Sequence, residues 1–239
     1  MKPSRLVIVR HAESTRNHAK QGSVYFADDA ARRVVRGTPD HLIPLTDDGL
    51  KQAEQTGAAV RDRFGVFDAV YHSGYTRTIQ TAEGILAAYS PEERDRMPVR
   101  ADLYIRERDP GYTYDMTTDE AEAAFPWMAE YWRTFGGFFA RPPGGESLAD
   151  VVARVNTFLQ AIERAHHGEK VLVVTHGGTI RCLRFALEHW DYTRALRWPE
   201  GQEPANCGVT TYESDGRDPL ALVDYNQVYW TVGSADDGA

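Results

Sequence analysis

The sequence predicts an α/β fold: a three-layer α/β/α sandwich with a mostly parallel central sheet and a helical insert. Three apolar runs have the length and composition of buried strands, and a segment with helix signals follows each of them. These runs span residues 6–9, 69–71 and 171–174. Strands that alternate with helices pack as a sheet covered on both faces. We expect one domain over residues 1–239, because a chain of this length can bury a single core.

In the first half, the first strand is predicted at residues 4–9, and Ser14 offers an N-cap for the helix that follows. A long connection at residues 22–44 has uneven composition, and connections of this length are usually functional or mobile. The next elements are a helix capped by Thr46 that runs to about residue 64, a strand near 68–72 and a helix that ends near 89.

In the second half, a short strand is predicted near residues 99–104. Thr117 and Glu120 then form a capping box that opens the helical insert, at about 117–145. The remaining predicted elements are a helix from Ser147 to about residue 166, a strand at 171–175, a helix to about 190, strands at 208–213 and 220–225, and a disordered tail from about 233.

Two of the predicted strands end on a histidine. Arg10 and His11 follow the first strand, and His176 with Gly177 follows the strand at 171–175. The carboxyl ends of parallel strands are where open α/β folds bind ligands. An imidazole there can act as nucleophile or base, and a guanidinium can hold an anion. The first segment alone is equally compatible with an ordinary polar loop, but the second occurrence favours a shared site.

These segments resemble the histidine phosphatase superfamily, also called the phosphoglycerate-mutase-like family. Its Arg-His-Gly signature is matched by Arg10-His11-Ala12, and its second histidine by His176-Gly177. Its Ser-x-x-x-Arg-x-x-Gln-Thr pattern is matched by Ser73, Arg77, Gln80 and Thr81, and its glutamate by Glu107. The matches run in order from residue 6 to 178, and residues 135–147 resemble a subgroup of small phosphatase-like members.

The resemblance implies a phosphatase that needs no cofactor and no metal and acts on a small phosphorylated substrate. His11 would become a phosphohistidine, and Glu107 would donate a proton to the leaving oxygen. Arg10, Arg77 and His176 would hold the phosphoryl oxygens. The resemblance further implies substrate contacts from Asn17, Thr38 and Gly177. For Glu107, a solvated charged run at residues 106–109 is the alternative interpretation.

Three departures from the family pattern bear on function. Ala12 stands where the signature has glycine, which leaves open a non-catalytic module that binds phosphorylated ligands. The mutase branch has a Thr-Gly-Trp segment, where this chain reads Arg36-Gly37-Thr38-Pro39-Asp40. The mutase clamp of two adjacent arginines has no match beyond Arg133 and Arg141. We therefore favour a phosphatase and keep a phosphoglycerate-type mutase as the alternative.

The composition limits which binding partners and which cellular location are expected. A net charge of −8 argues against nucleic acid, and apolar runs of at most four or five residues argue against a membrane span. The two cysteines have no metal or redox spacing, so a cytoplasmic location is expected, and homo-oligomerisation is left open. The aromatic residues at 125–139 fit a lid, a dimer face or core packing of the insert, and core packing is favoured.

Overall fold

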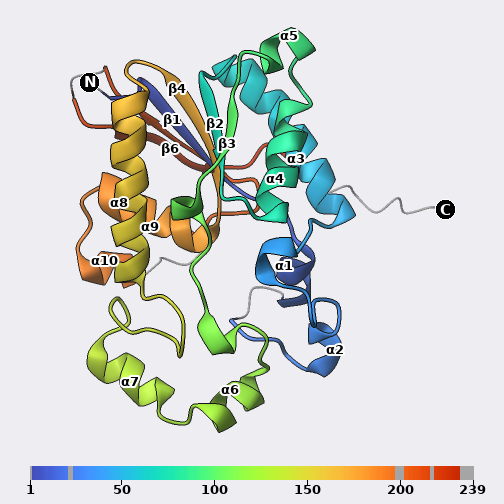
Figure 1. The fold of residues 1–239 in the computed structure, drawn as a ribbon, viewed down its shortest axis with the longest axis vertical. Coiled ribbons are helices and arrows are strands. Elements are labelled where there is room, and N and C mark those ends of the chain that lie inside the picture. Colours follow the sequence, from blue (N-terminus) through green and yellow to red (C-terminus); the bar gives the residue numbers. More distant parts are fainter. Residues whose placement is uncertain (1, 21–23, 197–201, 216–217, 232–239) are drawn as a thin grey trace, which may run out of the picture.

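The computed structural model describes residues 2–20, 24–196, 202–215 and 218–231. In these residues one six-stranded sheet has the order β3-β2-β4-β1-β5-β6 (Figure 1). Strands β3, β2, β4 and β1 are parallel, and β5 and β6 are antiparallel to their neighbours, so the predicted α/β class with a mostly parallel sheet is confirmed. The strands are β1 (Arg5–Arg10), β2 (Ala69–His72), β3 (Val99–Ala101), β4 (Lys170–Thr175), β5 (Val209–Glu213) and β6 (Ala221–Gln227).

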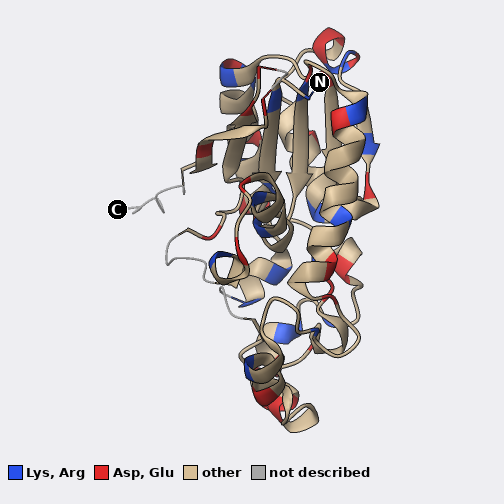
Figure 2. Ribbon diagram, turned by 90° about the vertical axis from the view of Figure 1, so that its left-hand side faces the viewer, with Lys and Arg blue, Asp and Glu red and all other residues tan. Residues whose placement is uncertain are grey.

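Helices cover both faces of the sheet, as the sandwich prediction requires (Figure 1). Alternate residues of β1 explain the two layers, because Leu6 and Ile8 pack on one face while Val7 and Val9 pack on the other. The first face is covered by α8 (Leu148–Ala165) and α9 (Gly177–Leu187). The second is covered by α3 (Asp47–Phe64) and α4 (Thr76–Leu86). The strands carry few charged residues (Figure 2), as expected where helices cover both faces of a sheet.

The predicted helix starts are confirmed. Thr46 caps α3 by accepting a hydrogen bond from the Gly49 backbone N–H at 3.0 Å. Thr117 and Ser147 each open a helix with a capping box. The smaller helices are α1 (Thr15–Lys20), α2 (Asp29–Arg32), α5 (Pro91–Arg94), α6 (Thr118–Ala124), α7 (Met128–Phe135) and α10 (Tyr192–Leu196), with 3-10 turns η1 (Asp40–Leu42), η2 (Leu103–Ile105) and η3 (Gly111–Thr113).

Some predicted boundaries are wrong. The third strand ends at Ala101 rather than near 104, because Asp102 caps a 3-10 turn by accepting from the Tyr104 N–H. Helix α4 ends at Leu86, three residues early. The insert is two helices, α6 and α7, divided at Pro126, whose missing N–H and ring interrupt a helix. The predicted tail from residue 233 lies outside the described residues.

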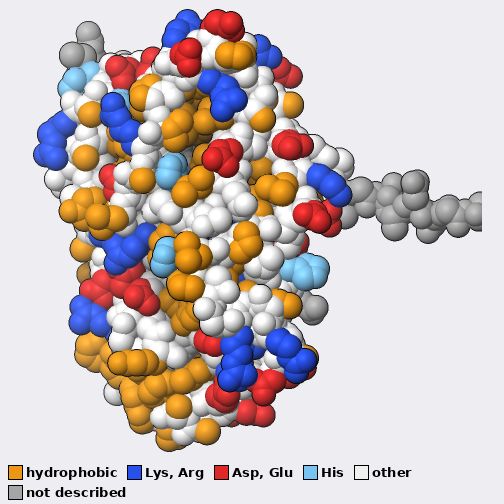
Figure 3. Space-filling model, turned by 45° about the vertical axis from the view of Figure 1, so that its right-hand side comes forward, with side chains coloured by type: hydrophobic (Ala, Val, Ile, Leu, Met, Phe, Trp, Pro, Cys, Tyr) orange, Lys and Arg blue, Asp and Glu red, His pale blue; other side chains and the backbone are white. Residues whose placement is uncertain are grey.

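The prediction that the aromatic insert packs as core is also wrong. No residue of α7 is buried, and Trp127 and Phe135 are 51% and 58% exposed. The insert extends beyond the end of the sheet, where no second layer covers it (Figure 1), and apolar side chains gather at this end of the surface (Figure 3). The rings pack on one another instead, as with Tyr131 and Phe135 at 5.4 Å between centroids. Of the phenylalanines and tryptophans in this stretch, only Phe138 is buried.

The register of the sheet places the two histidines side by side. Arg10 pairs with Thr175 across the parallel strands β1 and β4, so the residues that follow, His11 and His176, leave the same edge together. The His11 backbone N–H donates to the Thr175 carbonyl at 2.8 Å and continues the ladder by one residue. No helix in the described ranges is both long and apolar enough to cross a bilayer.

Candidate active site

His11 and His176 form the centre of the site. Their ring centroids are 5.1 Å apart with the ring planes at 64°, and both side chains are buried. The Nδ1 of His11 lies 2.7 Å from the Ala12 carbonyl oxygen. A carbonyl can only accept, so Nδ1 carries the proton and Nε2 of the neutral ring is left with its lone pair. In this tautomer Nε2 is the ring nitrogen that can act as a nucleophile.

Both imidazoles are held neutral by their surroundings. Burial lowers the pKa of His11 well below its usual value, and the positive charges of Arg77 and Arg10 lower it further. Burial and the charge of Arg77 likewise lower the pKa of His176. A charged ring here would sit unsolvated beside guanidinium groups, so the neutral form is favoured at physiological pH.

Arg10 borders the histidines at the end of β1. Its Nη1 donates to the Pro204 carbonyl at 2.5 Å, while its Nε is buried without a hydrogen-bond partner. A Cβ atom at Gly177 would lie 3.5 Å from this Nε, an ordinary van der Waals distance, so the first turn of α9 lies directly beside the guanidinium. A buried N–H without a partner is costly unless a ligand satisfies it. Arg10 and the start of α9 therefore present unsatisfied donors at the predicted phosphoryl position.

Arg77 lies on α4 and is only 4% exposed. Its Nη1 donates to the Asp40 carbonyl at 2.6 Å and to Oδ1 at 3.1 Å, and its Nη2 donates to Oδ2 at 3.3 Å. The sequence did not indicate this pairing, because Asp40 lies in the long connection, 37 residues away. Asp40 fixes the plane of the guanidinium by a bidentate contact.

Glu107 follows η2 and points to the histidine pair. Its Oε2 is 3.9 Å from Nδ1 of His176, and its Oε1 accepts from the Arg108 backbone N–H at 2.8 Å. Burial raises the pKa of this carboxyl group, so a proton is retained to higher pH than in water. A Cβ at Gly178 would approach Oε1 to 2.8 Å, so glycine gives the carboxylate its space. The side chain is 26% exposed, which does not fit a fully solvated charged run.

His176 is oriented by Ser73, a residue of the recognised motif to which the sequence assigned no role. The Ser73 hydroxyl lies 2.8 Å from Nε2 of His176 and 2.9 Å from the Thr78 hydroxyl. Tyr75 packs against the ring with centroids 5.0 Å apart. Nδ1 of His176 is buried and has no hydrogen-bond partner in the described part of the chain, so it remains available toward Glu107 and the pocket.

Asn17 and Thr38 lie at the border of the site. The Asn17 side-chain oxygen accepts from the Ser14 hydroxyl at 2.8 Å, so this end of the amide fixes the start of α1. The Thr38 carbonyl accepts from the Tyr114 hydroxyl at 3.2 Å and lies two residues before Asp40. The contacts of both residues with substrate remain predictions.

The C-terminal segment contributes Asn206, which sequence reasoning missed. Its Nδ2 donates to the His11 carbonyl at 3.0 Å and reaches Oδ1 of Asn17 at 3.4 Å. Trp230 Nε1 donates to the Asn206 carbonyl at 2.7 Å, and the Cys207 N–H donates to the Arg10 carbonyl at 3.1 Å. No motif surrounds Asn206 in the sequence, so the only signal was its polarity just before a predicted strand.

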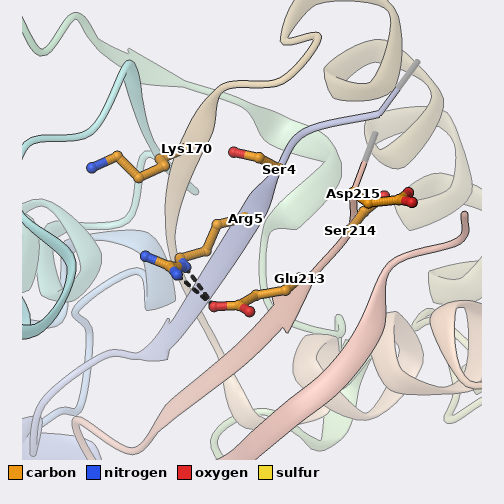
Figure 4. Close-up of a pocket in the computed structure, with 6 residues that line it drawn as sticks. All are labelled: Ser4, Arg5, Lys170, Glu213, Ser214 and Asp215. Carbon is orange, nitrogen blue, oxygen red and sulfur yellow. Dashed lines mark hydrogen bonds and ion pairs between the residues drawn. The ribbon is translucent and has the colours of Figure 1, made fainter. Parts of the chain in front are cut away.

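A separate hollow of about 520 Å³ lies at the opposite edge of the sheet (Figure 4). Arg5 at the beginning of β1 and Glu213 at the end of β5 form an ion pair at 2.5 Å within it. The other residues of its lining are Ser4, Lys170, Ser214 and Asp215. It holds no histidine and lies at the amino ends of β1 and β4, so it is distinct from the histidine site.

This cluster of two histidines and two arginines at one edge of a parallel sheet can bind an anion such as a phosphoryl group. The family model of the histidine phosphatase superfamily (branch 1) matches residues 6–227. The chain therefore belongs to the histidine phosphatase superfamily, whose members are phosphatases and mutases.

Mutases and a phosphatase are both among the proteins to which this chain is similar in sequence or in fold. A 2,3-bisphosphoglycerate-dependent phosphoglycerate mutase of Rhizobium etli is 32% identical over 77% of this chain and 80% of the relative. The phosphoglycerate mutase-like protein AT74 of Arabidopsis thaliana is 34% identical over 79% of this chain and 58% of that protein. The fold of the α-ribazole phosphatase from Shigella flexneri superposes with a TM-score of 0.72 at 20% identity, covering 96% of this chain and all of that one.

Proposed function

We propose that this protein hydrolyses phosphomonoesters of small molecules through a phosphohistidine on His11. The observation that carries the proposal is the hydrogen bond from Nδ1 of His11 to the Ala12 carbonyl, which leaves Nε2 as the nucleophile. Nε2 attacks phosphorus while the bond to the leaving oxygen breaks. Arg10, Arg77 and His176 bind the phosphoryl oxygens and stabilise their charge in the transition state. The backbone N–H of Gly177, in the first turn of α9, adds a donor for the same anion.

Glu107 is the proposed proton carrier for both half-reactions. Its raised pKa keeps it protonated for the first step, in which it donates to the leaving oxygen. The resulting carboxylate then accepts a proton from water, and that water attacks phosphorus and breaks the N–P bond. Inorganic phosphate leaves, and neutral His11 and protonated Glu107 are restored. The arginine and histidine side chains neutralise the charge of the phosphoryl oxygens and Glu107 carries the proton, so we propose no metal or cofactor.

Hydrolysis is favoured over mutase transfer by the state of the two candidate clamp residues. Arg133 pairs with Glu130 on α7, and Arg141 pairs with Asp150 of α8 at 2.6 Å. Both side chains are well exposed. Each already has an acidic partner, and holding a substrate carboxylate would require that partner to be exchanged. The names of the relatives include phosphoglycerate mutases, so transfer is the second candidate.

The non-catalytic alternative loses its only support. Ala12 is buried, and its N–H donates to the Thr81 hydroxyl at 3.0 Å. Ala12 is not among the described residues with positive φ, so alanine fits this backbone without strain. We also propose a cytoplasmic location, consistent with two buried free cysteines, and propose no role for nucleic acid or membrane.

The test is phosphate release from a panel of phosphorylated metabolites and p-nitrophenyl phosphate. Hydrolysis releases inorganic phosphate, with an acid-labile, base-stable label on the protein during turnover. Conversion of 3-phosphoglycerate to 2-phosphoglycerate without phosphate release would establish the mutase instead. Binding of phosphate without turnover of any substrate would establish the binding module.

A further inference from the structure

Beside the histidine pocket, two basic residues of α1 lack an acidic partner. Arg16 and Lys20 are four residues apart on the helix, so their side chains share one face. The Nη2 of Arg16 donates to the Tyr114 carbonyl at 2.6 Å, and Nζ of Lys20 donates to the Val24 carbonyl. No carboxylate in the described residues forms an ion pair with either side chain. Half-buried cations without a counterion are a costly arrangement that a bound anion would relieve.

The Arg16 guanidinium is oriented but not satisfied. It stacks on the Tyr114 ring, with Cζ 3.8 Å from the ring centroid. Its Nη1 is buried and has no hydrogen-bond partner. Stacking of this kind fixes the plane of the guanidinium and leaves its edge for a planar or tetrahedral anion. The unpaired N–H therefore marks a donor for a group that the protein itself does not supply.

Lys20 adds a second basic group beside Arg16. Burial and, after it, the charge of Arg16 lower the pKa of Lys20 to about 7, and the charges of Asp40 and Asp115 oppose this shift. An anion between the two side chains would favour the charged amine. The ammonium also lies 5.1 Å from the centroid of buried Phe26, which Arg16 approaches to 5.4 Å. Both cationic side chains therefore lie against the same aromatic ring, that of Phe26.

Contacts connect this pair to the histidine site. The Tyr114 hydroxyl donates to the Thr38 carbonyl, and Asp40, two residues on, holds Arg77. The charges of Asp40 and Arg77 are close enough to shift the pKa of Arg16. Arg16 also directly precedes Asn17, whose side-chain oxygen contacts the same Asn206 amide that donates to the His11 carbonyl. A short molecule with its phosphoryl group at His11 could therefore reach Arg16.

We infer that Arg16 and Lys20 form a second anion-binding site for another acidic group of the same substrate. The inference rests on the proposed function and narrows it to phosphomonoesters with a second phosphate or carboxylate across a short linker. Arg77, already paired with Asp40, serves the phosphoryl group that reacts. The second acidic group binds the unpaired edge of Arg16 and the Lys20 amine.

The experiment compares bisphosphates of linear alkanediols, with two to six carbons, against the corresponding monophosphates. We expect one chain length at which the wild-type protein prefers the bisphosphate by about 10- to 100-fold in kcat/KM, the size of a charge-assisted contact. This preference should collapse in Arg16→Met and in Lys20→Met. Arg36→Met removes an exposed cation of the neighbouring connection and should leave the preference intact.

Three results would overturn the inference. If the wild-type protein prefers the bisphosphate over the monophosphate by no more than the statistical factor of about two at every chain length, there is no second anion-binding site. Equal losses on both substrate series in Arg16→Met would assign Arg16 a structural role. Equal loss of preference in Arg36→Met would reduce the effect to general surface charge. Failure of the proposed function looks different, because the wild-type protein would then release phosphate from neither series.

Discussion

The rings of His11 and His176 meet edge to face, 5.1 Å apart, although the two residues are 165 positions apart in the chain and are brought together by the pairing of β1 with β4. His11 has its Nδ1 occupied by a carbonyl, whereas His176 has its Nε2 occupied by Ser73. The two imidazoles therefore present different nitrogens to the pocket. This asymmetry fits one nucleophile and one phosphoryl-binding residue.

His11→Ala should abolish phosphate release while the protein stays folded. The reason is that Nε2 of His11 is the atom proposed to form the bond to phosphorus. Circular dichroism and a phosphate-release assay check this, with His18→Ala as the control because that side chain is exposed. Substantial turnover by folded His11→Ala protein would rule out the phosphohistidine mechanism.

Glu107→Gln should slow alkyl phosphates by about 10²–10⁴-fold and p-nitrophenyl phosphate much less, because nitrophenolate leaves without a proton. The raised pKa of Glu107 fixes the sign of the pH effect: the acid form persists above its usual range and is lost as pH rises. The wild-type rate on alkyl substrates should therefore fall on the alkaline side, and the variant should lack that limb. Equal losses on both substrates would mean that another group is the acid.

Asn206→Ala should lower kcat by about tenfold with a smaller change in KM, because a buried carbonyl loses its donor and His11 loses its fixed orientation. Asn206→Asp should be worse, since a carboxylate would face the His11 carbonyl. Gln202→Ala, an exposed change in the same segment, serves as the control. A change confined to thermal stability, with kcat unaltered, would show that Asn206 does not position the histidine.

Activity should survive exhaustive treatment with EDTA. Arg10, Arg77 and His176 are proposed to neutralise the phosphoryl oxygens directly, so no divalent ion is required for that charge. The measurement is phosphate release before and after chelation and after readdition of Mg²⁺ or Zn²⁺. Loss of rate that either ion restores would contradict this role of the arginines.

Asp150→Ala should destabilise the protein by about 1 kcal/mol at pH 7, because the residue completes the capping box of α8. The Arg141 guanidinium and the Ser147 groups hold the pKa of this carboxyl well below its usual range. A depressed pKa stabilises the fold above the unfolded-state value and ceases to do so as pH falls toward the folded-state value. Urea unfolding should thus show a smaller difference between variant and wild type at pH 3 than at pH 7, and Glu122→Ala should show none at either pH.

The sequence by itself determined the local structure and the order of the motifs. Apolar runs marked β1, β2 and β4, and Thr46, Thr117 and Ser147 marked helix starts, because strand periodicity and capping depend on residues within a few positions. The same runs placed His11 and His176 at the ends of strands. The pairing of the two histidines then required only that their strands be parallel neighbours.

Only the tertiary structure decided which groups support the histidines. Asp40 reaches Arg77 from 37 residues away, and Asn206 reaches the His11 carbonyl from 195 residues away. Neither contact has a local signature, because each depends on how the connection at 22–44 and the segment before β5 fold against the sheet edge. The exposure of Trp127 and Phe135 was decided in the same way. An aromatic run is buried only where another layer covers it, and the presence of that layer is a property of the whole fold rather than of the run.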